Sequence, residues 1–211
     1  PQPGFHHWES FKGQGVYPGV TLNINGEHTS YEDTVYTSDL LTEHAVEWMD
    51  QLESDQPFFV YLSHKAVHSQ FKQAARHAGM YAGVDYELPA TYSQTIDDSY
   101  KELLWPEWVK QQRHSWHGVD YMYHAKGAVG DLVIDYCETL MGVDESIGTV
   151  MAYLEARGIA DETVVIYMGD NGFSWGEHGL IDKRHFYEES AKVPLLVLSL
   201  IHISEPTSRR G

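Results

Sequence analysis

Residues 131–172 read DLVIDYCETLMGVDESIGTVMAYLEARGIADETVVIYMGDNG, and this stretch predicts how the whole chain is organised. In residues 131–157 apolar side chains recur in alternating steps of four and three, which is typical of an amphipathic helix, and Gly158 predicts where that helix ends. The apolar run TVVIYM at residues 163–168 predicts a strand covered on both faces, which leads into a polar Gly-Asp-Asn-Gly turn. The apolar stripe of the helix comprises Tyr136, Leu140, Val143, Ile147, Val150 and Leu154.

Helices and strands alternate in the same way along most of the remaining chain. An amphipathic helix is expected to begin at Thr37 or Ser38, because either residue is a good N-cap. Apolar runs at residues 58–62 and 193–197 predict two further strands with both faces buried. This alternation predicts an α/β fold, a three-layer α/β/α sandwich with a largely parallel sheet.

The composition excludes several classes of protein. The 211 residues include 14 Lys and Arg against 31 Asp and Glu, a net charge of −17, which argues against nucleic acid or an anionic membrane surface as a partner. No apolar run approaches the roughly 20 residues of a membrane-spanning helix. Cys137 is the only cysteine, which excludes an internal disulfide framework, and its place in mid-helix predicts an inert thiol. Residues 1–36 are rich in Gly, Pro, Asn and Tyr and predict loops with short strands.

Polar clusters follow two of the predicted strands. Lys65 and His68 come after residues 58–62, whereas Asp170 and Asn171 come after residues 163–168. Parallel sheets bind ligands beyond the carboxyl ends of their strands, so both clusters are candidates for one site. Carboxylate and amide oxygens suit calcium or magnesium rather than zinc, although Asp-Asn-Gly taken alone is more typical of an ordinary turn. A metal ion beside Lys and His suits an oxyanion such as sulfate or phosphate.

Three stretches carry a resemblance to a known family. DNGFSWGEHGLIDKRHFYEESAKVPLLV at residues 170–197 resembles the signature of type I sulfatases of the alkaline phosphatase superfamily, and PFFVYLSHKAVHSQF at residues 57–71 resembles an earlier sulfatase block. SFKGQGVYPGVTLNINGE at residues 10–27 is similar to bacterial N-acetylglucosamine-6-sulfatases and related polysaccharide sulfatases. The resemblance covers about residues 4–197.

The resemblance implies roles for seven residues. Asp170 and Asn171 are expected to ligate calcium, with magnesium as the less favoured ion. His68 is expected to be catalytic beside the leaving oxygen, and Lys183 to be catalytic by clamping sulfate. Substrate contacts are implied for Lys65, His178 and Arg184. His64, in contrast, is expected to be a packing residue.

The sequence also departs from the family. The family nucleophile is a formylglycine made within a C-x-P-S-R or S-x-P-S-R motif, and neither motif occurs here. That motif, a first pair of calcium-binding Asp residues and a Gly-Lys-Trp-His block normally precede the position of Pro1. We therefore expect residues 1–197 to be an N-terminally truncated part of the catalytic domain, inactive by itself. Residues 198–211, LSLIHISEPTSRRG, resemble translated sequencing-adapter sequence and are expected to be a non-native tail.

The expected function is hydrolysis of sulfate esters, on a sulfated sugar or polysaccharide, in the periplasm or outside the cell. Two alternatives are a phosphonate or phosphodiester hydrolase of the same superfamily and a catalytically inactive carbohydrate-binding relative. The sequence leaves the oligomeric state open. His114, His117 and His124 could mark a zinc site, although their spacing matches no dependable zinc pattern. Sugar rings could stack on Trp105, Trp108 and Trp116, although packing of an irregular loop region onto the sheet is favoured at least as much.

Overall fold

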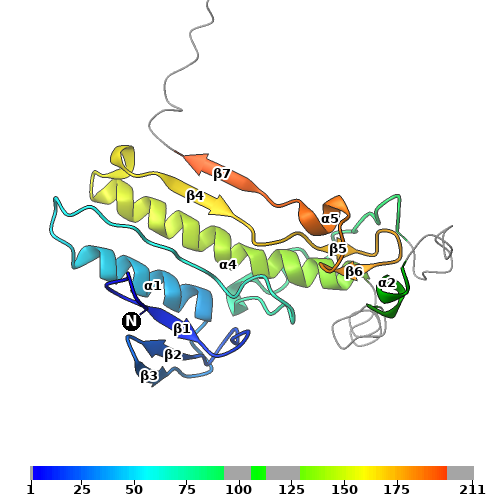
Figure 1. Cartoon of the computed structure of the whole chain (residues 1–211), viewed down its shortest axis with the longest axis horizontal. Helices are drawn as coiled ribbons and strands as arrows, with labels where there is room; N and C mark the ends of the chain where they lie inside the picture. The colour runs from blue at the N-terminus through cyan, green and yellow to red at the C-terminus, as the bar shows by residue number, and fades with distance from the viewer. Residues whose placement is uncertain (1, 93–105, 113–128, 199–211) are drawn as a thin grey trace, which may run out of the picture. The chain divides into compact units, whose positions relative to one another are not determined.

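The computed structural model describes residues 2–92, 106–112 and 129–198 (Figure 1). The chain forms two compact units. Unit 1 consists of Pro1–Gly83 with Asp135–Arg157, and unit 2 of Val84–Ile134 with Gly158–Gly211. The seven candidate site residues are divided between these units.

A small antiparallel sheet begins unit 1. Its strands are β1 (Glu9–Phe11), β2 (Thr21–Ile24) and β3 (Glu27–Ser30), in the order β1-β2-β3. Asn25 and Gly26 join β2 to β3 with φ angles of 53° and 105°, the positive values that a two-residue hairpin requires. Leu22 is completely buried and packs with Leu40 and Leu41. These short strands agree with the pattern predicted for residues 1–36.

Two helices form the rest of the framework of unit 1. Helix α1 (Thr37–Asp50) lies beside the part of α4 (Val129–Ala156) that belongs to this unit (Figure 1). Thr42 Oγ1 lies 2.6 Å from Ser146 Oγ, and Arg157 donates to Asp50 at 3.0 Å. Gly158 has a φ of 70°, the left-handed conformation typical of a helix end, which confirms the predicted stop. A single 3₁₀ turn lies at Ala75–His77.

The predicted N-cap of α1 is wrong. The N-cap residue is Tyr36, and the Thr37 hydroxyl donates to the carbonyl of Val16 at 2.7 Å instead of capping the helix. Ser38 Oγ is buried with no hydrogen-bond partner among the described residues. The Thr37 hydroxyl, which the local sequence pattern predicts to cap the helix, therefore bonds the preceding loop instead.

Unit 2 contains short elements around two antiparallel strand pairs. β4 (Val165–Met168) pairs with β7 (Leu195–Leu198), and the two strands lie side by side in yellow and orange in Figure 1. β5 (Ser174–Trp175) pairs with β6 (Ile181–Asp182) as a small hairpin. Every strand pair in the described part of the chain is antiparallel. The elements are α2 (Glu107–Gln112), a 3₁₀ turn (Ala160–Glu162), β4 (Val165–Met168), β5 (Ser174–Trp175), β6 (Ile181–Asp182), α5 (Glu188–Ala191) and β7 (Leu195–Leu198).

The predicted burial of the three strands is wrong. Residues 58–62 are not assigned to a strand, and the side chains of Phe59 and Tyr61 are about three-quarters exposed. Half-buried and exposed positions alternate along β4, and all four residues of β7 are exposed. An apolar run indicates only that a strand is suited to burial. Whether the strand is buried depends on a second layer of structure that packs over it. β4 has one hydrogen-bonded neighbour among the described strands.

Several predicted features lie away from the framework. Cys137 is half-buried on α4, and burial raises the pKa of its thiol, which disfavours the nucleophilic thiolate. Trp108 lies on α2 and is exposed. Leu198 forms the end of β7. None of the described helices combines the length and apolarity needed to cross a bilayer. The following residues lie outside the described ranges: Trp105, Trp116, His114, His117, His124 and residues 199–211.

Candidate active site

The turn from Lys65 to His68 carries the two candidate residues of unit 1. The amide of His68 donates to the carbonyl of Lys65 at 2.9 Å, which closes the turn. Lys65 is buried, and its Nζ lies 4.6 Å from the centre of the Tyr17 ring. An ammonium over an aromatic face is attracted by the negative face of the ring, which offsets part of the loss of hydration. The charge of Lys65 is therefore held in a defined place.

The ring of His68 has a fixed orientation. Its Nδ1 lies 2.7 Å from the carbonyl oxygen of Ser69. Because a carbonyl oxygen can only accept a hydrogen bond, Nδ1 carries the proton of this bond. Nε2 is then the atom through which the imidazole gains or loses its second proton. The half-buried ring thus has the arrangement that a general acid or base requires.

His64 holds the same segment against the helices. Its Nε2 lies 3.1 Å from Ser146 Oγ, which in turn lies 2.6 Å from Thr42 Oγ1. Burial lowers the pKa of His64 to about 4, and the nearby negative charge of Asp39 opposes that change only in part. The imidazole is consequently neutral at pH 7. These contacts support the interpretation of His64 as a packing residue.

In unit 2, Asp170 and Asn171 follow β4 in a tight polar turn. Asp170 Oδ1 accepts from the amide of Asn171 at 2.9 Å, and Asn171 Nδ2 donates to the carbonyl of Gly172 at 2.7 Å. The amide oxygen of Asn171 therefore faces away from that carbonyl. A Cβ at position 172 would collide with the carbonyl oxygens of Glu189 and Lys192, so glycine is required there by close approach.

The β5–β6 hairpin positions the remaining candidates. His178 adopts a φ of 58° in the loop, its amide donates to Thr91 O at 2.8 Å, and its ring stacks on Tyr187 with centroids 4.0 Å apart. Lys183 follows β6 directly and is half-buried, with no ion pair to any described carboxylate. Arg184 Nε donates to Asp182 Oδ2 at 2.6 Å. Lys183 is thus better placed than Arg184 to offer its charge to an anion.

His185 completes the aromatic cluster of this hairpin. Its ring is buried and meets Tyr187 edge-on, with centroids 5.5 Å apart. Burial lowers the pKa of His185, opposed by the charge of Glu189. Burial thus favours the neutral form of the ring. Its burial fits a structural contribution to the hairpin rather than contact with substrate.

The side-chain oxygens of Asp170 and Asn171 match part of the ligand set that a hard cation needs. Asp170 offers carboxylate oxygens and Asn171 an amide oxygen, the ligand types that calcium prefers. Calcium takes about 6–8 oxygen ligands, so these two residues would supply only part of a complete set. No cluster of three or more His, Cys, Asp or Glu suited to a metal ion occurs within the described ranges.

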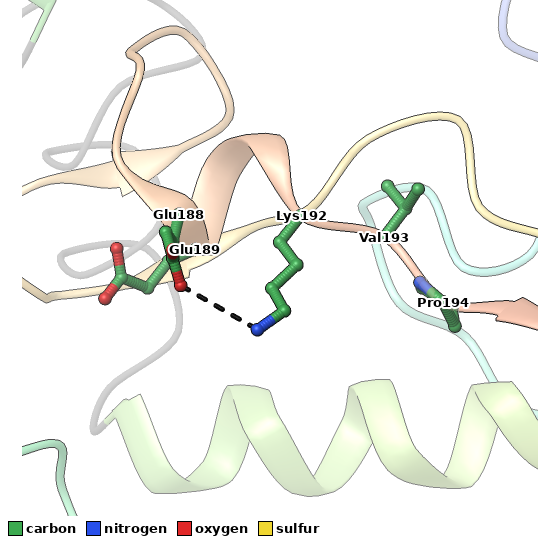
Figure 2. Close-up of a pocket in the computed structure, with 5 residues that line it drawn as sticks. All are labelled: Glu188, Glu189, Lys192, Val193 and Pro194. Atoms are coloured by element: carbon green, nitrogen blue, oxygen red, sulfur yellow. Dashed lines mark ion pairs between the residues drawn. The ribbon is translucent and has the colours of Figure 1, made fainter.

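Unit 2 also carries a surface pocket, which borders the polar turn. Figure 2 shows its lining at the end of α5 and the start of β7, where Lys192 Nζ lies 3.8 Å from Glu188 Oε2. Both partners of this ion pair are exposed. None of the seven predicted site residues lines the pocket, and it does not correspond to the predicted site. Its lining residues are Glu188, Glu189, Lys192, Val193 and Pro194.

Two aromatic residues of the candidate site were not predicted from the sequence. Tyr17 contacts Lys65 through its ring and donates from its hydroxyl to the His68 carbonyl at 2.5 Å. Tyr187 stacks on His178. Neither residue stands at a spacing that distinguishes it from the other tyrosines of the chain, so only the folded structure identifies them.

Comparisons with known proteins support the same assignment. A sequence model described as "Sulfatase" matches residues 5–210. The chain is 26% identical over 245 residues to an N-acetylglucosamine-6-O-sulfatase of Bacteroides thetaiotaomicron, covering 92% of this chain and 44% of that protein. It is 27% identical over 198 residues to the N-acetylglucosamine-6-sulfatase of Capra hircus, covering 92% of this chain and 34% of that protein.

A solved structure shows how far the fold agrees. It holds a protein in complex with its substrate, D-glucosamine-2-N,6-O-disulfate, and matches with a TM-score of 0.74 and 24% identity. The match covers 95% of this chain and 51% of that one. This likeness confirms the predicted α/β fold class. The chain spans about half, or less, of the length of the relatives it matches.

Proposed function

Because the chain belongs to the sulfatase family, we propose that it acts in the hydrolysis of sulfate esters on sulfated sugars or polysaccharides. The observation that carries the proposal is the family match, which extends over residues 5–210. Relatives that act on N-acetylglucosamine-6-sulfate, by their names, support a sulfated amino sugar as the substrate. The resemblance to the family supports a periplasmic or secreted location.

The proposed general acid is His68. Its Nδ1–H is engaged by the Ser69 carbonyl, so we assign the proton that is transferred to the departing oxygen to Nε2. Sulfate ester hydrolysis leaves a sugar alkoxide unless that oxygen is protonated as its bond to sulfur breaks. A positioned imidazolium is therefore most valuable for a sugar, whose hydroxyl is a poor leaving group.

The proposed sulfate clamp is Lys183. Its ammonium has no ion-pair partner among the carboxylates of the described residues, which leaves its charge for the sulfate oxygens. Lys65 and His178 are proposed to contact the substrate, as the resemblance to the family implies. Arg184 is proposed to do so while retaining its ion pair with Asp182.

The family also implies two groups that residues 1–211 do not supply by themselves. Calcium, held in part by Asp170 and Asn171, would neutralise negative charge on the sulfate oxygens, and a formylglycine from outside these residues would supply the nucleophile. The oxygen donors of the Asp-Asn pair fit this ion, and the absence of the nucleophile motif from the sequence is the reason for placing the formylglycine elsewhere.

The test uses the complete gene product that contains this sequence. Release of sulfate from N-acetylglucosamine-6-sulfate and from an aryl sulfate is measured by ion chromatography, beside hydrolysis of an aryl phosphodiester. The proposal predicts faster turnover of both sulfate esters than of the phosphodiester. Preference for the phosphodiester would instead support the related hydrolase activity, and sugar binding without turnover would support an inactive carbohydrate-binding relative. Either outcome would overturn the proposal.

A further inference from the structure

We propose that Tyr17 is a positioning residue of the candidate active site, because its one buried side chain holds both Lys65 and His68. The inference rests on the proposed function, since it concerns the same turn. It assigns Tyr17 two separable tasks. The hydroxyl fixes the backbone of His68, and the ring face fixes the ammonium of Lys65.

Tyr17 is itself held firmly by its surroundings. Its side chain is 4% exposed, and its carbonyl accepts from the amide of Thr37 at the start of α1 at 2.6 Å. Its ring stacks on that of Tyr36, with centroids 6.0 Å apart and planes 20° apart. The hydroxyl of Tyr36 donates in turn to the carbonyl of Lys72 at 3.0 Å. Tyr17 is therefore a rigid support rather than a mobile loop side chain.

The hydroxyl of Tyr17 acts on His68. It donates to the His68 carbonyl at 2.5 Å, across 51 residues of sequence. Burial, the largest cause, together with the nearby Tyr36 and Tyr136, raises the pKa of Tyr17, so the hydroxyl stays protonated and remains a donor. The hydrogen bonds on the carbonyl and on the ring Nδ1 of His68 then add to the bond of its amide to Lys65. Together they set the direction of Nε2.

The ring of Tyr17 acts on Lys65. The ammonium lies 4.6 Å from the ring centre, while Lys65 as a whole is 8% exposed. A charge that is taken out of water needs compensating interactions, and the π face supplies one of them. Because the carbonyl of Lys65 also closes the turn to His68, the two residues are fixed relative to each other.

These two tasks predict different kinetic consequences. A general acid that is displaced by a fraction of an ångström transfers its proton poorly, which matters most for a poor leaving group. A displaced substrate-binding ammonium weakens binding of every sulfate ester that it contacts. Removing only the hydroxyl should therefore affect kcat on a sugar sulfate, whereas removing the ring should also affect KM.

The experiment compares Tyr17→Phe and Tyr17→Leu in the complete gene product, on N-acetylglucosamine-6-sulfate and on an activated aryl sulfate. Tyr17→Phe should lower kcat on the sugar sulfate about 10-fold, the effect of one lost hydrogen bond, and change the aryl sulfate little. Tyr17→Leu should in addition raise KM about 10-fold on both substrates. Tyr36→Phe is the matched control, since it also removes a buried hydroxyl that donates to a carbonyl, in this case that of Lys72 rather than that of His68.

Tyr17→Phe decides the outcome, because it keeps the ring and its packing even where Tyr17→Leu does not fold. Wild-type kinetics of Tyr17→Phe, equal losses on both substrates, or losses no greater than those of Tyr36→Phe would each overturn the inference. His68→Ala separates this failure from failure of the proposed function. If His68→Ala impairs the sugar sulfate selectively and Tyr17→Phe does not, only the assignment of Tyr17 is wrong.

Discussion

Acidification should destabilise the protein through His64. Burial lowers the pKa of this imidazole from its ordinary value of 6.5 to about 4, so the folded protein holds it neutral while the unfolded chain protonates it. Its contribution to stability is complete above pH 6.5 and is lost progressively as the pH falls toward 4. At pH 5 these two values correspond to a loss of about 2 kcal/mol in the free energy of unfolding.

Replacing His64 with glutamine should remove this part of the acid sensitivity. Glutamine retains a polar group that can bond Ser146 Oγ but does not titrate. Urea unfolding followed by tryptophan fluorescence at pH 7 and pH 5 gives the loss of stability for each protein. The loss in the wild type should exceed that in His64→Gln by about 2 kcal/mol.

An exposed histidine provides the control for this measurement. His28 lies on β3, where every residue is exposed, and His28→Gln should lose as much stability between pH 7 and pH 5 as the wild type. Comparing the variants removes the contribution of the other titrating groups. Equal losses in the wild type and in His64→Gln would refute the reasoning, because the buried neutral ring would then not be the source of the acid sensitivity.

Three further predictions concern the polar turn and the clamp. Asp170→Ala should abolish calcium-dependent activity and weaken calcium binding measured by titration calorimetry, and unchanged binding would contradict its assignment as a ligand. Gly172→Ala should lower the free energy of unfolding by about 2 kcal/mol or more through its clash with carbonyl oxygens near α5, whereas Gly148→Ala, in open space on α4, should be neutral or stabilising by up to about 1 kcal/mol. Lys183→Ala should lower kcat/KM about 100-fold or more, to the same extent on sugar and aryl sulfates, and a loss confined to one of them would argue against a clamp on the shared sulfate group.

Local patterns predicted the extents of α1 and α4 well because their causes are local, whereas the short helix α2 was not predicted. The apolar stripe of α4 and the stop at Gly158 depend on residues three or four apart and on one backbone conformation. The N-cap of α1 was not predicted, since the Thr37 hydroxyl is taken by the carbonyl of Val16, 21 residues earlier. The burial of β4 was not predicted either, because it depends on structure that packs over the strand rather than on the strand itself.

The candidate site, like the fold, was predicted from the sequence only in part. Its charged residues were identified through their resemblance to family motifs, and those roles remain proposals. The support beneath them was not identifiable, because Tyr17 meets His68 across 51 residues and nothing in the local sequence distinguishes it from other tyrosines. Motifs thus predict which side chains carry chemistry, whereas the residues that orient those side chains emerge only from the fold.

The most direct test of the central claim is the effect of His68→Ala on kcat/KM for two substrates of the complete gene product, N-acetylglucosamine-6-sulfate and an activated aryl sulfate. If His68 protonates the leaving oxygen from Nε2, the variant should lose about 100-fold or more on the sugar sulfate and far less on the aryl sulfate, whose leaving group departs without a proton. Equal losses on the two substrates would contradict the assignment of His68 as the general acid of a sulfatase.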